Sequence, residues 1–257
     1  MARNFGFTPR EWRALRALGT PVGIQRALEA MPYHIASSAW SPRRVLHERT
    51  AHCLEGAIFA AAALRVLGFA PLLLDLEAVQ DTDHVISVYR VRGHWGAIAK
   101  SNFSGLRFRE PVYRSVRELV MSYFDSYINL RGERTLRAHS RPIDLARFDR
   151  SHRGWMTSER DLWWIAEHLV GVPHTRLLTT GMTRNLSRVD RRARRRPGRL
   201  PRALSRQGVA EGGVRGSGGS SRASARGTYT VVDSLRQTIA QPIERSRSST
   251  SACRRSA

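Results

Sequence analysis

The sequence has only two cysteines, a single lysine and no long apolar run. Cys53 and Cys253 cannot form a disulfide framework, so we expect the protein to fold in a reducing compartment. No stretch approaches the roughly 20 apolar residues that a membrane-spanning helix needs. The opening residues also lack the apolar centre of a signal peptide. These absences predict a cytoplasmic protein that is not embedded in a membrane.

Acidic residues are scarce, with 21 against 43 basic residues, and the formal net charge is +22. A basic field of this size concentrates polyanions. Its distribution is uneven, because residues 179–257 carry 18 arginines and 4 acidic residues, a net charge of +14. Lys100 is the only lysine, whereas patches that neutralise phosphates usually mix lysine with arginine. This pattern argues against nucleic acid as the partner.

Composition divides the chain near residue 178. The apolar fraction of the whole chain is 41%, which is enough for a core in the first segment. Beyond that point apolar periodicity stops, and Arg, Ser and Gly dominate. Such a composition cannot bury a core. We predict one folded domain over residues 1–178 and a disordered tail over residues 179–257.

The apolar pattern of the first segment predicts an α+β fold. Its strongest helix runs from about His52 to Leu67, is apolar nearly all round, and ends at Gly68. The pair Arg92-Gly93 predicts a hairpin. Strands are expected at residues 71–79, 84–91 and 94–101. Two short helices separated by Gly19-Thr20-Pro21 are expected within residues 9–31, and further helices at 41–50, 115–130 and 159–169. We therefore expect a central helix packed on an antiparallel sheet, with extra helices around it.

Cys53 lies at the start of the central helix. The unpaired amides and positive dipole end of a helix stabilise a thiolate, which predicts a lowered thiol pKa. His84 starts the second strand, from where its ring can point toward that helix. An imidazole within hydrogen-bonding distance of a sulfur can take its proton and return it to a leaving group. Three other histidines are alternatives for this base: His52, His94 and His174.

Two stretches around this pair carry a family resemblance: MPYHIASSAWSPRRVLHERTAHCLEGAIFAAAALRVLGFAPLLLDL and DHVISVYRVRGHW. They resemble the bacterial type of the transglutaminase-like superfamily, in which a cysteine opens a helix and a histidine-bearing strand leads into a hairpin with Trp. The resemblance covers about 70 residues, 32–102. It implies a papain-like core there, with accessory helices in residues 103–178. It also implies that Cys53 attacks an acyl carbon of a protein or peptide-like amide and that His84 acts as base and acid, without metal or cofactor.

The third residue of the family's triad is missing. The family usually places an aspartate about four residues after the hairpin Trp, and counting from Trp95 this position is Ala99. Asn102 follows that strand, and an asparagine can orient the imidazole as it does in papain-like enzymes. Asn102 is therefore the third candidate catalytic residue, with Asp75 and Asp83 as alternatives.

Two functions fit these residues. The first is thiol-dependent acyl transfer or amide hydrolysis, the choice depending on whether an amine or water reaches the acyl-enzyme. The second is a catalytically inactive binding module of the same fold, which the alanine at position 99 favours. In that case Cys53 would be a small buried residue that only packs. Glu55, in the first turn of the central helix, is interpreted as a helix-start residue that interacts with the dipole.

Overall fold

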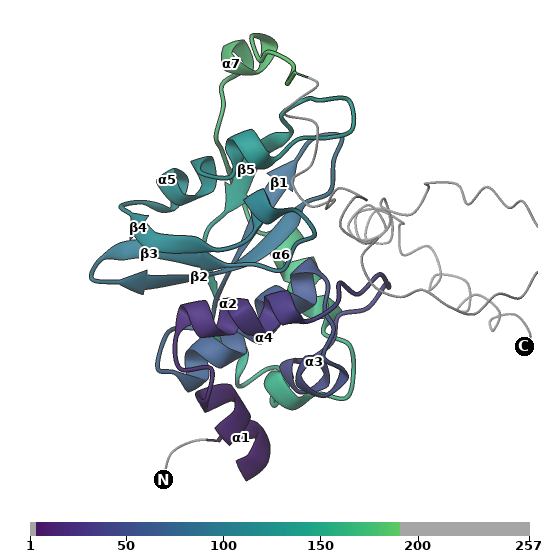
Figure 1. Ribbon diagram of the computed structural model, residues 1–257, viewed down its shortest axis with the longest axis vertical. Helices are drawn as coiled ribbons and strands as arrows, with labels where there is room; N and C mark the ends of the chain where they lie inside the picture. Colours follow the sequence, from purple (N-terminus) through teal and green to yellow (C-terminus); the bar gives the residue numbers. More distant parts are fainter. Residues whose placement is uncertain (1–3, 191–257) are drawn as a thin grey trace, which may run out of the picture.

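The structure is a computed structural model that describes residues 4–190. It confirms the predicted α+β class, with a seven-stranded antiparallel sheet and several helices (Figure 1). No helix within residues 4–190 is long and apolar enough to cross a membrane. Residues 191–257, most of the segment predicted to be disordered, lie outside the described residues.

The sheet has the strand order β4-β3-β2-β1-β5-β7, and β6 pairs with β1. Its strands are β1 (Leu72–Ala78), β2 (His84–Val91), β3 (His94–Ile98), β4 (Arg109–Tyr113), β5 (Leu136–Ser140), β6 (Ile143–Asp144) and β7 (His174–Arg176). The α-helices are α1 (Pro9–Arg16), α2 (Pro21–Ala30), α3 (Pro42–Glu48), α4 (Cys53–Val66), α5 (Val116–Met121), α6 (Trp163–Gly171) and α7 (Thr180–Arg184). Short 3₁₀ helices cover Ser104–Leu106, Phe124–Ser126, Leu145–Phe148 and Trp155–Thr157.

Helix α4 is the predicted central helix. Every one of its residues except Arg65 is buried, as expected for a helix that is apolar all round. Gly68 follows it with a φ of 94°, a left-handed conformation that glycine adopts without a steric penalty. The helix packs on β2 and is surrounded by α1, α2 and α3 on the same side of the sheet (Figure 1).

Two hydrophobic cores cover the two faces of the sheet. Side chains alternate between these faces along each strand. The α4-side core takes Leu73 of β1 together with Val85 and Tyr89 of β2. The α5-side core takes Leu74 and Leu76 of β1, Ile86 and Val88 of β2, and Ala97 and Ala99. Because His84 precedes Val85 and pairs with Leu76, it belongs to the α5 side of the strand.

Strands β2 and β3 form the predicted hairpin, with positive φ angles at Arg92 and Gly93. The predicted strand to residue 101 is shorter in the structure and ends at Ile98, opposite Ser87. The reason is Gln25 of α2, whose side chain bonds both the N–H and the carbonyl of Ala99 at 3.1 Å. The chain then leaves the sheet, and residues 84–86 extend beyond the end of β3.

Defined structure continues to residue 190, beyond the predicted boundary at 178. Thr179 caps α7 by accepting from the Met182 N–H, and the Val189 N–H donates to the Gly132 carbonyl at 2.8 Å. Val189 is buried. The burial of Val189 and its hydrogen bond to Gly132 attach this segment to the domain, although its apolar residues show no periodicity.

Candidate active site

Cys53 is the first residue of α4, and its side chain is 7% exposed. The sulfur lies near the start of β2, where the Val85 backbone and the Tyr33 hydroxyl, from the segment before α3, both act on its ionisation. Gly56, one turn into α4, permits this placement: a Cβ there would lie 2.4 Å from the Cβ of Lys100. The first turn of α4 therefore packs directly against the segment that leaves the sheet.

Burial raises the pKa of the Cys53 thiol. Hydrogen bonding by the Val85 backbone and by Tyr33 acts in the opposite direction, while the charge of Asp75 adds to the increase. The lowered pKa predicted from the helix start is therefore wrong for this state of the protein. The increase in pKa caused by removing the sulfur from water is larger than the decrease caused by the helix amides, so Cys53 is a thiol at neutral pH.

Tyr33 is a member of the site that sequence reasoning missed. It is held beside the helix start by a parallel bridge between Tyr33 and Ala51, and by the His34 N–H, which donates to the Ala51 carbonyl at 3.1 Å. Burial, followed by the negative charge that Cys53 carries once it ionises at high pH, raises the pKa of the Tyr33 hydroxyl, which stays protonated. Tyr33 lies twenty residues before Cys53 in an irregular segment, so no regular spacing in the sequence could have indicated that the two side chains are close.

His84 is 5% exposed, and its Nε2 atom lies 3.0 Å from the carbonyl oxygen of Leu106. Burial lowers the pKa of His84 to about 4, so the ring is neutral at pH 7. A carbonyl oxygen can only accept, and Nε2 must therefore carry the hydrogen. The Nδ1 atom is then unprotonated, which is the state that a general base requires.

The structure brings Cys53 and His84 to the same end of β2 but from different faces. The Val85 backbone meets the sulfur, and His84 is the preceding residue on the α5 side. Within residues 4–190, no hydrogen bond joins the sulfur to the His84 ring. Residues 84–86 extend past the end of β3 but stay buried.

The candidate orienting residues are placed differently from the prediction. Asn102 is exposed in the loop after β3, whereas the Leu106 carbonyl is the partner of the His84 ring. Asp83 accepts from the Ala78 N–H at 2.8 Å, which is a turn contact. Asp75 lies 3.0 Å from Nε2 of His174. A sequence motif cannot predict that a backbone carbonyl is the partner of the His84 ring, because every residue has a carbonyl.

The three alternative histidines have other partners. The ring of His52 bonds the Ser38 carbonyl at 2.8 Å, and the ring of His94 bonds the Arg92 carbonyl at the far end of the hairpin. The hydrogen bond to Asp75 raises the pKa of His174. Among the described residues, none of these three rings hydrogen-bonds to Cys53.

Glu55 has a larger structural role than the predicted interaction with the helix dipole. Its carboxylate is fully buried and accepts from the Ser38 hydroxyl at 2.7 Å and from the Trp40 and His52 N–H groups at 3.1 and 3.2 Å. The His34 ring lies 3.0 Å away. Burial alone would raise the pKa of Glu55, but the charge of His52 and these hydrogen bonds leave it lowered. Glu55 therefore ties the segment that follows Tyr33 to the start of α4.

Within residues 4–190 the structure contains no cluster of three or more His, Cys, Asp or Glu side chains arranged to hold a metal ion. No protein-family model matches the chain, and no curated protein is significantly similar to it.

Proposed function

We propose that the protein is a thiol-dependent enzyme of the transglutaminase-like type that transfers or hydrolyses an acyl group. Cys53 is the nucleophile, His84 is the base, and the substrate is a protein or peptide-like amide. One observation carries this proposal: the sulfur at the start of α4 lies against the backbone of the residue that follows His84. We place the substrate carbonyl at this end of β2, where Cys53 and His84 are both buried.

The reaction begins from a neutral pair, because burial raises the pKa of Cys53 and lowers that of His84. When substrate is bound, the Nδ1 atom of His84 takes the thiol proton and the sulfur attacks the acyl carbon. The imidazolium then gives this proton to the leaving amine as the carbon–nitrogen bond breaks. Water or a second amine, deprotonated by His84, resolves the thioester and restores the thiol.

The Leu106 carbonyl takes the role of the missing aspartate, which is to orient the His84 ring. It accepts the Nε2 hydrogen of His84, which fixes the tautomer and the orientation of the ring. Its partial negative charge also stabilises the imidazolium that forms during the reaction. A carbonyl stabilises a cation less than a carboxylate does, so we propose a slower enzyme than one with a Cys-His-Asp triad.

The Tyr33 hydroxyl is the group best placed to stabilise the oxyanion. Its influence on the ionisation of the sulfur indicates a donor near the atom to which the acyl carbon becomes attached. The raised pKa of Tyr33 keeps it protonated, and therefore a donor, throughout the neutral pH range.

The test is acylation by p-nitrophenyl acetate in the Cys253→Ala background, where Cys53 is the only thiol. We expect nitrophenolate release and an acetyl group on Cys53, detected by peptide mass spectrometry. His84→Gln should slow acylation by about 100-fold, the usual contribution of a general base. His94→Gln is the matched control, since His94 lies at the other end of the hairpin, and should react at the parental rate.

The inactive binding module is the second candidate, favoured by the buried alanine at position 99 and by the raised pKa of the Cys53 thiol. It predicts equal and slow acylation in the parent and in both histidine variants. That result would overturn the catalytic proposal.

A further inference from the structure

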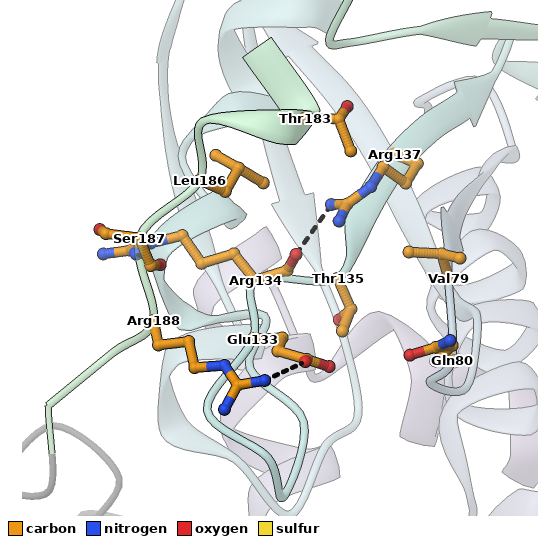
Figure 2. A pocket seen from close by; sticks show the side chains of 10 residues that line it. All are labelled: Val79, Gln80, Glu133, Arg134, Thr135, Arg137, Thr183, Leu186, Ser187 and Arg188. Carbon is orange, nitrogen blue, oxygen red and sulfur yellow. Dashed lines mark hydrogen bonds and ion pairs between the residues drawn. The ribbon is translucent and has the colours of Figure 1, made fainter. Parts of the chain in front are cut away.

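A pocket of about 300 Å³ lies beyond the end of β1 (Figure 2). Its walls are the turn after β1, residues 133–137 and the segment that follows α7. Neither Cys53 nor His84 contributes to its lining. Any ligand of this pocket is therefore distinct from a group attacked by the thiol.

Among the described residues, positive charge predominates in this pocket, because three arginines and one acidic residue, Glu133, line it. Arg134 is paired with Asp125 at 2.8 Å and also donates to the Ser187 carbonyl. Arg188 lies 3.5 Å from Glu133, with its side chain 72% exposed. Two of the three lining arginines therefore have a carboxylate partner, and Arg137 is left as the third.

Arg137 is the lining arginine whose charge is least compensated by nearby carboxylates. One of its terminal nitrogens donates to the carbonyl of Arg134 at 2.8 Å (Figure 2) and to the carbonyl of Leu136 at 2.9 Å. Within the described part of the chain it forms no ion pair with a carboxylate. The side chain is half-buried, and burial lowers the pKa of its guanidinium. The remaining N–H groups of the guanidinium therefore lack an anionic acceptor.

We propose that this pocket binds a small oxyanion, the phosphate or carboxylate group of a small molecule, with Arg137 as the principal ligand and Arg188 at the entrance. Both groups present oxygen acceptors that match the planar fork of a guanidinium. The volume of about 300 Å³ is at the lower end of the range of small-molecule sites.

The experiment measures thermal unfolding of the full chain with inorganic phosphate or citrate, each compared with sodium chloride at equal ionic strength. A ligand that binds only the folded state raises the Tm, so we expect an increase with at least one of the two anions. The phosphate and citrate measurements distinguish the two chemistries. Arg137→Gln should weaken binding by at least about tenfold, as expected for loss of a charge-assisted hydrogen bond.

Arg153→Gln is the matched control, because it removes the same charge from an exposed position outside the pocket, and it should keep the parental shift. Arg188→Gln is a second test on an exposed side chain, where loss of folding is not a concern, and should weaken binding about threefold or more. An absence of stabilisation by both anions would overturn the proposal. So would equal shifts in the parent, Arg137→Gln and Arg188→Gln, because the anion would then bind elsewhere.

Discussion

The Nε2 atom of His84 donates to the Leu106 carbonyl across 3.0 Å. This contact joins the first residue of β2 to the loop after β3, where both residues are buried. It determines which nitrogen of the ring is free to accept a proton, and it does so without an acidic side chain. The proposed mechanism rests on this bond.

Asn102→Ala tests whether the Leu106 carbonyl or Asn102 orients the His84 ring. Since the Asn102 side chain is exposed and the carbonyl already holds Nε2, we expect the acylation rate of Cys53 to change by less than about twofold, within the range of a surface substitution. The rate is followed by nitrophenolate release in the Cys253→Ala background. A tenfold decrease would instead assign the orienting role to Asn102.

The depressed pKa of His84 predicts a loss of stability in acid. Its folded-state pKa is about 4, below the usual value of about 6.5, so the unfolded chain binds the proton first. Above pH 6.5 the titration of His84 does not change the free energy of unfolding. As the pH falls from 6.5 to 4, it lowers that free energy progressively. The full effect is about 3 kcal/mol.

Urea unfolding at several pH values measures this effect. His84→Gln cannot titrate, so its stability relative to the parent should improve as the pH falls from 6.5 to 4. A constant difference between the two proteins over this range would contradict the assigned pKa.

Glu55→Gln should destabilise the protein. The buried carboxylate accepts from Ser38 and Trp40 on one oxygen and from His52 on the other. An amide replaces one of these oxygens by an NH₂ group, so the donors facing it lose their acceptor and meet another donor. We expect a loss of at least about 2 kcal/mol in the free energy of unfolding. Glu159→Gln, at an exposed position, is the control and should change stability by less than about 0.5 kcal/mol.

Gly56→Ala should disturb the start of α4. The added Cβ would meet the Cβ of Lys100 at 2.4 Å, and neither atom can move without its backbone. We expect a loss of about 1–3 kcal/mol, typical of overpacking, together with faster alkylation of Cys53 by iodoacetamide as the sulfur becomes more exposed. Gly171→Ala is the control, since a Cβ there meets no atom within 4 Å. Unchanged stability and alkylation in Gly56→Ala would show that the first turn can shift freely.

The local elements follow from the sequence alone. The all-apolar run from Cys53 to Val66 determines a buried helix, because a helix without a polar face must be covered on every side. The hairpin at Arg92-Gly93 and the antiparallel pairing of β1 to β3 follow from short apolar runs with turn residues between them. These features depend on residues close together in the chain, so periodicity is enough to predict them.

The surroundings of the two candidate catalytic side chains were decided by the tertiary structure. Whether the Cys53 pKa is lowered by the helix start or raised by burial depends on how much water the fold removes. The length of β3 depends on Gln25, which is distant in the chain and takes the backbone groups of Ala99. The partner of His84 is a backbone carbonyl, which has no signature in a sequence. Such contacts form between segments far apart in the chain, and only their packing in three dimensions selects them.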